Sequence, residues 1–153
     1  EEPSDLDKAR IVKGARGIKS IKEAIPGLDD LMRDIQDTAK ERGWITGLDG
    51  RKLMVRKPHA ALNTALQSAG AIACKLWIIL FQDRMKALGY TLRVHYNQIL
   101  WVHDEIQNEH VKGLGPTITE ASEWAAKEAA KRLNLRGTLR TASKTATSWA
   151  GTH

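Results

Sequence analysis

The feature that most constrains the fold of this chain is the stretch from His59 to Leu88, which contains no proline and is rich in alanine, leucine and isoleucine. Pro58 precedes it and Gly89 follows it, and these residues favour the start and the end of a helix. The stretch therefore predicts one long helix, much of it buried. Its most apolar part, Ala69 to Phe81, is interrupted by Lys75 and is shorter than the roughly 20 residues that cross a bilayer, which favours a buried helix and no membrane partner.

Two helices and a hairpin are predicted before the long helix. The residues from Ser4 to Ala24 favour a first helix, which Pro26 ends. Leucine, methionine and isoleucine then recur at spacings of three and four, which predicts an amphipathic helix that stops at Gly43. Trp44 to Arg56 is typical of a hairpin, because Leu48-Asp49-Gly50 contains the Asp-Gly pair that tight turns favour.

A second hairpin, a helix and an irregular tail are predicted after the long helix. Arg93 to Val111 holds β-branched and aromatic residues around the polar trio His103-Asp104-Glu105, which predicts two antiparallel strands joined by a tight turn at the trio. Pro116 lies near the start of a helical segment that continues to Leu133. Leu135 to His153 is predicted as short strand or coil. Ordinary composition and the lack of a linker predict one domain over residues 1–153.

Charge and cysteine content narrow the class of protein. The chain has 24 basic and 18 acidic residues, a formal net charge of +6, which favours a polyanionic partner such as nucleic acid. Cys74 is its one cysteine, which excludes an intramolecular disulfide and a zinc site built on several thiolates. A reducing, cytoplasmic location fits this content and the lack of a signal-peptide pattern.

The first candidate site is the trio at the predicted turn of the second hairpin. A turn there presents Asp104 and Glu105 at an edge of the sheet. Adjacent carboxylates are hard oxygen ligands of the kind that Mg²⁺ takes together with water and substrate phosphates. Taken alone, the trio is better explained as a solvated turn, because aspartate favours turns.

Two further groups of side chains are candidates for binding nucleic acid. His59, Asn63 and Gln67 are spaced by four and so lie along one stripe of the long helix, from which they could read minor-groove acceptors. An ordinary polar helix face explains the same spacing. The second group comprises cations of the first hairpin, which would hold backbone phosphates or simply keep a face solvated: Arg51, Lys52, Arg56 and Lys57.

Three segments, in this order, resemble family A DNA polymerases, most closely the bacteriophage replicative branch. The segment GLDGRKLMVRKPHAALNTALQSAGAIACKLWII, Gly47 to Ile79, is similar to the hairpin and following palm helix of that branch. The segment LWVHDEIQ, Leu100 to Gln107, is similar to the family's motif C. The closing Trp-Ala-x-x-His, Trp149 to His153, resembles the end of phage members.

The resemblance implies a fold and an activity. The fold would be α+β, with residues 1–43 as a helical segment that follows the fingers and 44–153 as the C-terminal part of the palm, a small antiparallel sheet packed against long helices with an edge that exposes apolar surface. The activity would be template-directed nucleotidyl transfer in DNA replication. Its partners would be primer-template DNA and a deoxynucleoside triphosphate, in the cytoplasm of a host if the chain is phage-derived.

The resemblance also implies roles for single residues. Asp104 would bind the two catalytic Mg²⁺ ions, Glu105 would stand beside the metal site, and His103 would lie near the primer 3′ end. The stripe of His59, Asn63 and Gln67 would line the minor groove.

Part of the family's catalytic set has no match in this sequence. Nothing between Glu1 and Gly43 matches motif A or the fingers helix with its lysine and tyrosine. We therefore expect the chain to supply half of a composite site that an upstream portion or a second polypeptide completes, and to be inactive alone. A non-enzymatic DNA-binding remnant and a small Mg²⁺-dependent nuclease using Asp104 and Glu105 stay open as alternatives.

Overall fold

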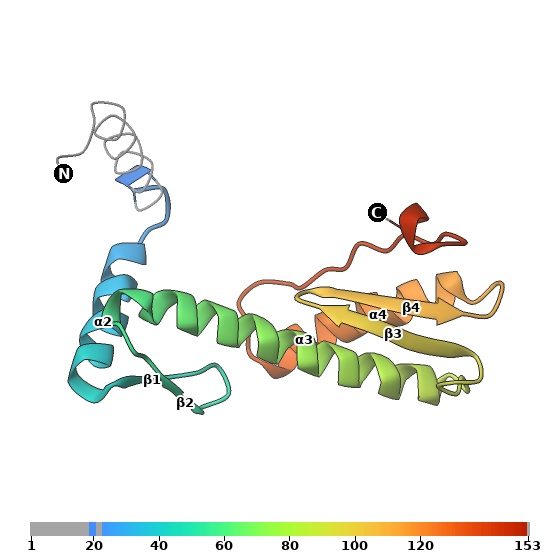
Figure 1. The fold of residues 1–153 in the computed structure, drawn as a ribbon, viewed down its shortest axis with the longest axis horizontal. Helices are drawn as coiled ribbons and strands as arrows, with labels where there is room; N and C mark the ends of the chain where they lie inside the picture. Colours follow the sequence, from blue (N-terminus) through green and yellow to red (C-terminus); the bar gives the residue numbers. More distant parts are fainter. Residues whose placement is uncertain (1–18, 21–22, 153) are drawn as a thin grey trace, which may run out of the picture. The chain divides into compact units, whose positions relative to one another are not determined.

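The computed structural model describes residues 19–20 and 23–152, and the helix predicted over Ser4–Ala24 falls largely outside these residues. The chain divides into two compact units. The first contains the described residues up to Ile45 together with Lys52–Thr64, and the second contains Thr46–Arg51 and the residues from Ala65 onward. In chain order the elements are α2 (Leu28–Arg42), β1 (Trp44–Thr46), β2 (Lys52–Met54), the 3₁₀ turn η1 (Pro58–Ala60), α3 (Ala61–Ala87), β3 (Tyr96–Val102), β4 (Glu105–His110), α4 (Gly115–Arg132) and the 3₁₀ turn η2 (Trp149–Gly151) (Figure 1).

In the first unit, α2 confirms the predicted amphipathic helix. Asp29 and Asp30 lie in its first turn, where negative charge interacts favourably with the helix dipole. Gly43 ends the helix with φ +73°, a left-handed angle that favours glycine. The Gly43 amide donates to the Ala39 carbonyl at 3.0 Å, so the last turn of the helix is capped by its own backbone.

The β1–β2 hairpin has the turn that its Asp-Gly pair predicts. The Gly50 amide donates to the Gly47 carbonyl at 3.0 Å, and Gly50 adopts φ +82°. This is the arrangement of a three-residue hairpin loop that ends on a left-handed glycine. The Val55 amide donates to the Gly43 carbonyl at 3.0 Å and continues the strand pairing. Ile45 and Val55 are buried, so the hairpin has an inner apolar face.

The long helix α3 is present, but the expectation that much of it is buried is wrong. Its buried residues are Ala61, Leu80, Phe81 and Met85. The buried core that β3 and α4 share with α3 involves its C-terminal half, and Leu66 nearer the start keeps 63% of its surface exposed. An apolar composition predicts that a helix is buried by other elements. It does not predict along which part of the helix those elements pack.

The segment Pro58–Ala87 is long and apolar enough to cross a membrane by length and composition alone. The shorter run Ala69–Phe81, taken by itself, is not. Core helices of soluble proteins pass the same test of length and composition. Leu80 and Phe81 are buried in a cluster with residues of β3 and α4, so the C-terminal half of α3 belongs to the core of the second unit.

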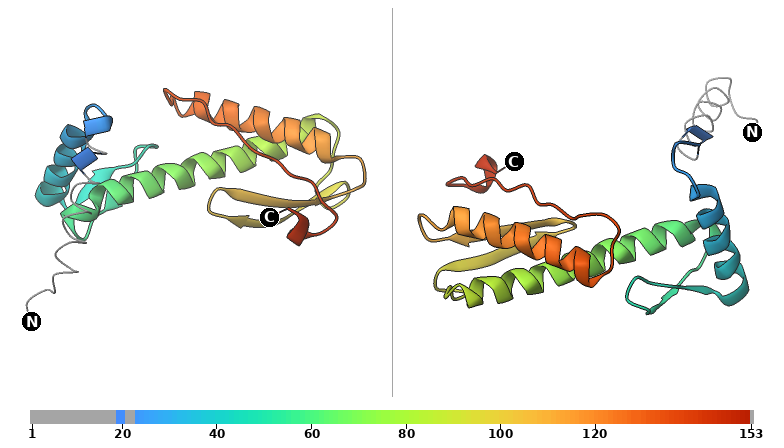
Figure 2. Two further views of the ribbon diagram at one scale, coloured as in Figure 1. Left: turned by 90° about the horizontal axis from the view of Figure 1, so that it is seen from above. Right: turned by 180° about the vertical axis from the view of Figure 1, so that it is seen from behind.

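The core of the second unit lies between α3, β3 and α4. The rings of Phe81 and Tyr96 meet edge to face, with centroids 5.7 Å apart. Ala121, Ala125 and Ala129 of α4 belong to the same buried cluster, and their spacing of four places them on one side of that helix. Figure 2 shows the β3–β4 hairpin and α4 running alongside the C-terminal half of α3. The α+β class, with a small antiparallel sheet on long helices, is thereby confirmed.

The β3–β4 hairpin is antiparallel and contains one irregularity. Tyr96 to Gln98 pair with His110 to Asn108, and Leu100 to Val102 pair with Gln107 to Glu105. Ile99 is therefore an extra residue in β3, which makes a β-bulge. Ile99 keeps 64% of its surface exposed, so this strand does present apolar surface to solvent, as expected.

The last part of the chain follows the prediction of a helix and then coil. After α4, residues 134–148 contain neither helix nor strand. The tail nevertheless packs on the start of α4, because a Cβ at Gly115 would approach Thr145 Oγ1 to 3.1 Å. The irregular tail therefore packs within the second unit, which also contains the β3–β4 hairpin.

Candidate active site

The turn of the β3–β4 hairpin places the acidic pair at an exposed tip. Val102 pairs with Glu105, which leaves His103 and Asp104 as the turn residues. His103 adopts φ +52°, a left-handed angle in which histidine is found more often than most other residues with a side chain. The Trp101 indole Nε1 donates to the His103 carbonyl at 2.8 Å and so stabilises this conformation. The tight turn predicted at the trio is present, and Asp104 is exposed in it.

Glu105, the first residue of β4, is held by a neighbour on the same strand. The Gln107 side-chain amide donates to the Glu105 carboxylate, and residues two apart on a strand share a face. Among residues 19–20 and 23–152, no three His, Cys, Asp or Glu side chains form a group that could hold a metal ion. Asp104 and Glu105 can therefore supply carboxylates, while other ligands would come from water, substrate or further protein groups.

A cleft of about 820 Å³ opens beside this turn, within the second unit. Asp104 and Glu105 line one side of it, and residues of α3, α4 and the tail line the rest. Trp77 Nε1 donates to the Ser122 carbonyl at 3.0 Å and joins α3 to α4 at the cleft. The acidic turn thus adjoins an open space with walls that are held by packing between elements.

Two polar atoms in the walls of the cleft are buried without a hydrogen-bond partner among the described residues, Asn108 Oδ1 and Thr141 Oγ1. Such atoms cost free energy unless a water molecule or a ligand satisfies them. The sequence did not predict either residue as part of a site, because Thr141 belongs to a tail without periodicity. For Asn108, its place on the strand that follows the acidic turn was the one available signal.

Cys74 of α3 also lines the cleft and is sensitive to the charge of Asp104. Burial raises the pKa of the Cys74 thiol, and the negative charge of Asp104 raises it further. Because the thiolate is the reactive form, we expect iodoacetamide to alkylate Cys74 more slowly than a free cysteine at about pH 8. Asp104→Asn should speed the reaction and move its pH midpoint downward, because it removes the negative charge. Mass spectrometry of the chain over a pH series measures both effects.

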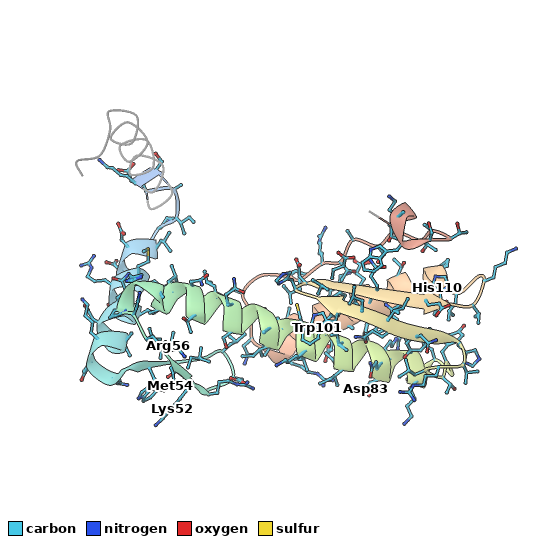
Figure 3. All side chains as sticks on the ribbon, viewed as in Figure 1. Lys52, Met54, Arg56, Asp83, Trp101 and His110 are labelled. Atoms are coloured by element: carbon cyan, nitrogen blue, oxygen red, sulfur yellow. The ribbon has the colours of Figure 1, made fainter. Side chains whose placement is uncertain are left out.

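Asp83→Asn is the matched control for this alkylation experiment. Asp83 is also an exposed carboxylate, and it lies on α3 outside the cleft lining (Figure 3). This substitution should leave the alkylation rate of Cys74 unchanged. Equal acceleration by both substitutions would show that Cys74 responds to the overall charge of the chain and not to Asp104.

The side chains predicted to line a minor groove are all exposed. Asn63 and Gln67 lie one turn apart on α3. His59 is exposed too, but it lies in η1, the 3₁₀ turn that leads into α3, and not in the helix itself. All three are accessible to solvent, as contact with a duplex would require.

The two arginines predicted to hold phosphates differ in their surroundings. Arg51 Nε donates to Asp49 Oδ2 at 2.6 Å. This bond holds the pKa of the Asp49 carboxyl below its ordinary value. Arg56 follows β2 and is exposed. A phosphate would have to compete with Asp49 for Arg51, so Arg56 is the more accessible of the two.

Comparison with known proteins gives consistent matches, although no family model matches the chain. The chain is 37% identical to the DNA-directed DNA polymerase of Enterobacteria phage T3 and 38% identical to that of Escherichia phage T7. Each match covers 88% of this chain and 22% of the phage protein, so the chain spans about a fifth of the length of these relatives.

A solved structure has a similar fold. It is the POL domain of Pol1 from M. smegmatis, in complex with DNA primer-template and dNTP, with a TM-score of 0.63. The sequences are 23% identical, and the match covers 76% of this chain and 22% of that chain. The resemblance stated from three sequence segments is thereby confirmed. Over most of its length, this chain is a homologue of a segment of the phage T3 and T7 DNA-directed DNA polymerases.

Proposed function

We propose that the chain is the part of a DNA-directed DNA polymerase that supplies motif C and the primer-template helix for template-directed nucleotidyl transfer in DNA replication. The observation that carries the proposal is the exposed Asp104-Glu105 turn beside a cleft, in a chain homologous to phage DNA polymerases. Primer-template DNA and a deoxynucleoside triphosphate would be its partners, in the cytoplasm of a host cell.

Asp104 and Glu105 fit a share of a Mg²⁺ site. Mg²⁺ is usually bound through one or two carboxylates, with water and substrate phosphates completing its coordination. When bound, two such ions would activate the primer 3′-hydroxyl and stabilise charge on the triphosphate. Because no third acidic, histidine or cysteine side chain joins this pair among the described residues, we propose that motif A of an upstream portion or a second polypeptide completes the site.

The neighbours of the acidic pair would position it for this role. The hydrogen bond from Gln107 restrains the Glu105 carboxylate, and the bond from Trp101 restrains the turn before Asp104. A restrained carboxylate loses less entropy when it takes up its catalytic geometry. We propose that the His103 side chain, in the same turn, lies near the primer 3′ end.

The exposed polar stripe would hold the duplex, and the hairpin cations would hold backbone phosphates of the bound DNA. His59, Asn63 and Gln67 would hydrogen-bond minor-groove acceptors, which check duplex geometry with little sequence preference. Arg56 would contact a backbone phosphate directly. Arg51 would do so after its ion pair with Asp49 opens.

The test is a chimera in which this chain replaces the matching segment of the Escherichia phage T7 DNA polymerase. We expect the isolated chain to incorporate no nucleotide on a primed template with Mg²⁺, because it presents no complete electrostatic clamp for the triphosphate. The chimera should extend the primer. Gel analysis of labelled primers measures both reactions.

Two outcomes would contradict the proposal. Templated incorporation by the purified isolated chain would show that its site is not half of a composite. A soluble chimera that binds primer-template DNA but extends no primer would favour the alternative of a non-enzymatic DNA-binding remnant. Primer-template binding, measured separately, distinguishes that result from a chimera that has failed to fold.

A further inference from the structure

The β1–β2 hairpin has two chemically different faces. The Val55 amide donates to the Gly43 carbonyl at 3.0 Å, so these residues are paired. The next residues towards the turn, Trp44 and Met54, therefore lie opposite each other. Side chains alternate along a strand, so Met54 points away from the inner face on which Val55 is buried.

The face opposite Val55, here named the outer hairpin face, combines cations with apolar groups. It is formed by Trp44, Lys52, Met54 and Arg56. Met54 keeps 73% of its surface exposed, the largest value among the large hydrophobic side chains in the described part of the chain. Lys52 Nζ lies 4.5 Å from the centroid of the Trp44 ring, a cation–π contact that places positive charge beside the indole. Figure 3 shows Lys52, Met54 and Arg56 along this hairpin.

The charge of this hairpin is positive on its outer face. Asp49 is the only carboxylate between Gly43 and Lys57, and it is paired with Arg51. Lys52 and Arg56 stand two residues before and after Met54, about 7 Å along an extended chain on either side. An exposed apolar group is thus flanked by two exposed cations.

We infer that the outer hairpin face binds single-stranded DNA, with phosphates on Lys52 and Arg56 and a base packed against Met54 and the edge of Trp44. The inference rests on the proposed function for its choice of DNA as the nucleic acid. Lys52 and Arg56 can bind phosphates, but the thioether of Met54 offers a phosphate no favourable interaction. An unstacked base offers Met54 an apolar surface, whereas the bases of a duplex are already stacked. The mixture of groups therefore favours a single strand over a duplex.

The test measures binding of a labelled oligo-dT to the full chain by fluorescence anisotropy at several salt concentrations. The double substitution Lys52→Gln/Arg56→Gln should make the negative slope of log K against log salt less steep by about 1.4. Each phosphate contact on a single strand contributes about 0.7 to its magnitude. Met54→Ala should weaken binding at least about fivefold and leave that slope unchanged, because the thioether contacts the base through an apolar, uncharged surface. Circular dichroism verifies that both variants fold.

The control Lys86→Gln/Lys112→Gln makes the same change in net charge at exposed positions outside the hairpin, and it should leave the slope unchanged. An equal loss of slope in this control, or unaltered binding by Met54→Ala, would overturn the inference. Tighter binding of oligo-U than of oligo-dT would overturn DNA as the ligand. The proposed function is tested separately, by the effect of Gln67→Ala on binding to duplex DNA. If single-strand binding fails its test, duplex binding can still be measured, and the reverse is also true.

Discussion

Asp104→Asn will lower the rate of primer extension by the chimeric polymerase by roughly a thousandfold or more. The substitution keeps the size of the side chain but replaces one carboxylate oxygen with an amide donor and removes the negative charge that a divalent cation needs. Because Asp104 is exposed in a turn, no loss of stability should accompany the loss of activity. Single-turnover extension at saturating nucleotide isolates the chemical step from binding.

Primer-template affinity and a neighbouring carboxylate provide the controls for this result. The affinity of the chimera for DNA should change little, and Asp83→Asn, on α3, should leave the rate unchanged. Extension within a few-fold of the unsubstituted chimera would remove Asp104 from the metal site. It would also leave Glu105 without the partner on which its proposed role depends.

Phe81→Ala will destabilise the chain by about 3–5 kcal/mol. Phe81 is 1% exposed and meets Tyr96 edge to face, so truncation removes both buried area and an aromatic contact. Burial also raises the pKa of the Tyr96 hydroxyl, as its place in the same core requires. A loss of this size is a large share of the roughly 5–15 kcal/mol that stabilises a typical domain. Urea unfolding followed by tryptophan fluorescence gives the free energy.

Ile79→Ala is the matched control for the core substitution, because Ile79 lies on the same helix and keeps 55% of its surface exposed. It should cost about 0.5 kcal/mol or less. A similar cost for Phe81→Ala and Ile79→Ala would mean that the C-terminal half of α3 is not the packed side of the second unit.

The order of the described elements, and several of their ends, followed from local residue chemistry. Gly43 and Gly89 ended helices because their left-handed angles favour glycine, and the Asp49-Gly50 pair marked a hairpin loop. The acidic turn was also predictable, since the trio His103-Asp104-Glu105 interrupts two apolar segments. Each of these signals lies within a few residues of the feature it determines.

Features that depend on distant segments could not be predicted in the same way. The incomplete burial of α3 depends on where β3 and α4 pack, and no local pattern encodes that position. The unpartnered Asn108 and Thr141 atoms arise because the tail meets the hairpin at the cleft. The ion pair between Asp49 and Arg51 joins residues only two positions apart. Opposite charges at that spacing did not by themselves predict that the two side chains pair.

The bulge at Ile99 has a consequence for how this hairpin can change in evolution. One register holds on the side of Tyr96, whose burial anchors the strand, and another holds on the side of the Asp104 turn. Deleting Ile99 would join the two registers into one regular ladder with the same pairs and faces, because Gln98 and Leu100 already lie opposite the consecutive residues Asn108 and Gln107. The hairpin can therefore lose this one residue without changing which residues flank the Asp104 turn, and what it would lose is the local bend and added twist of the bulge.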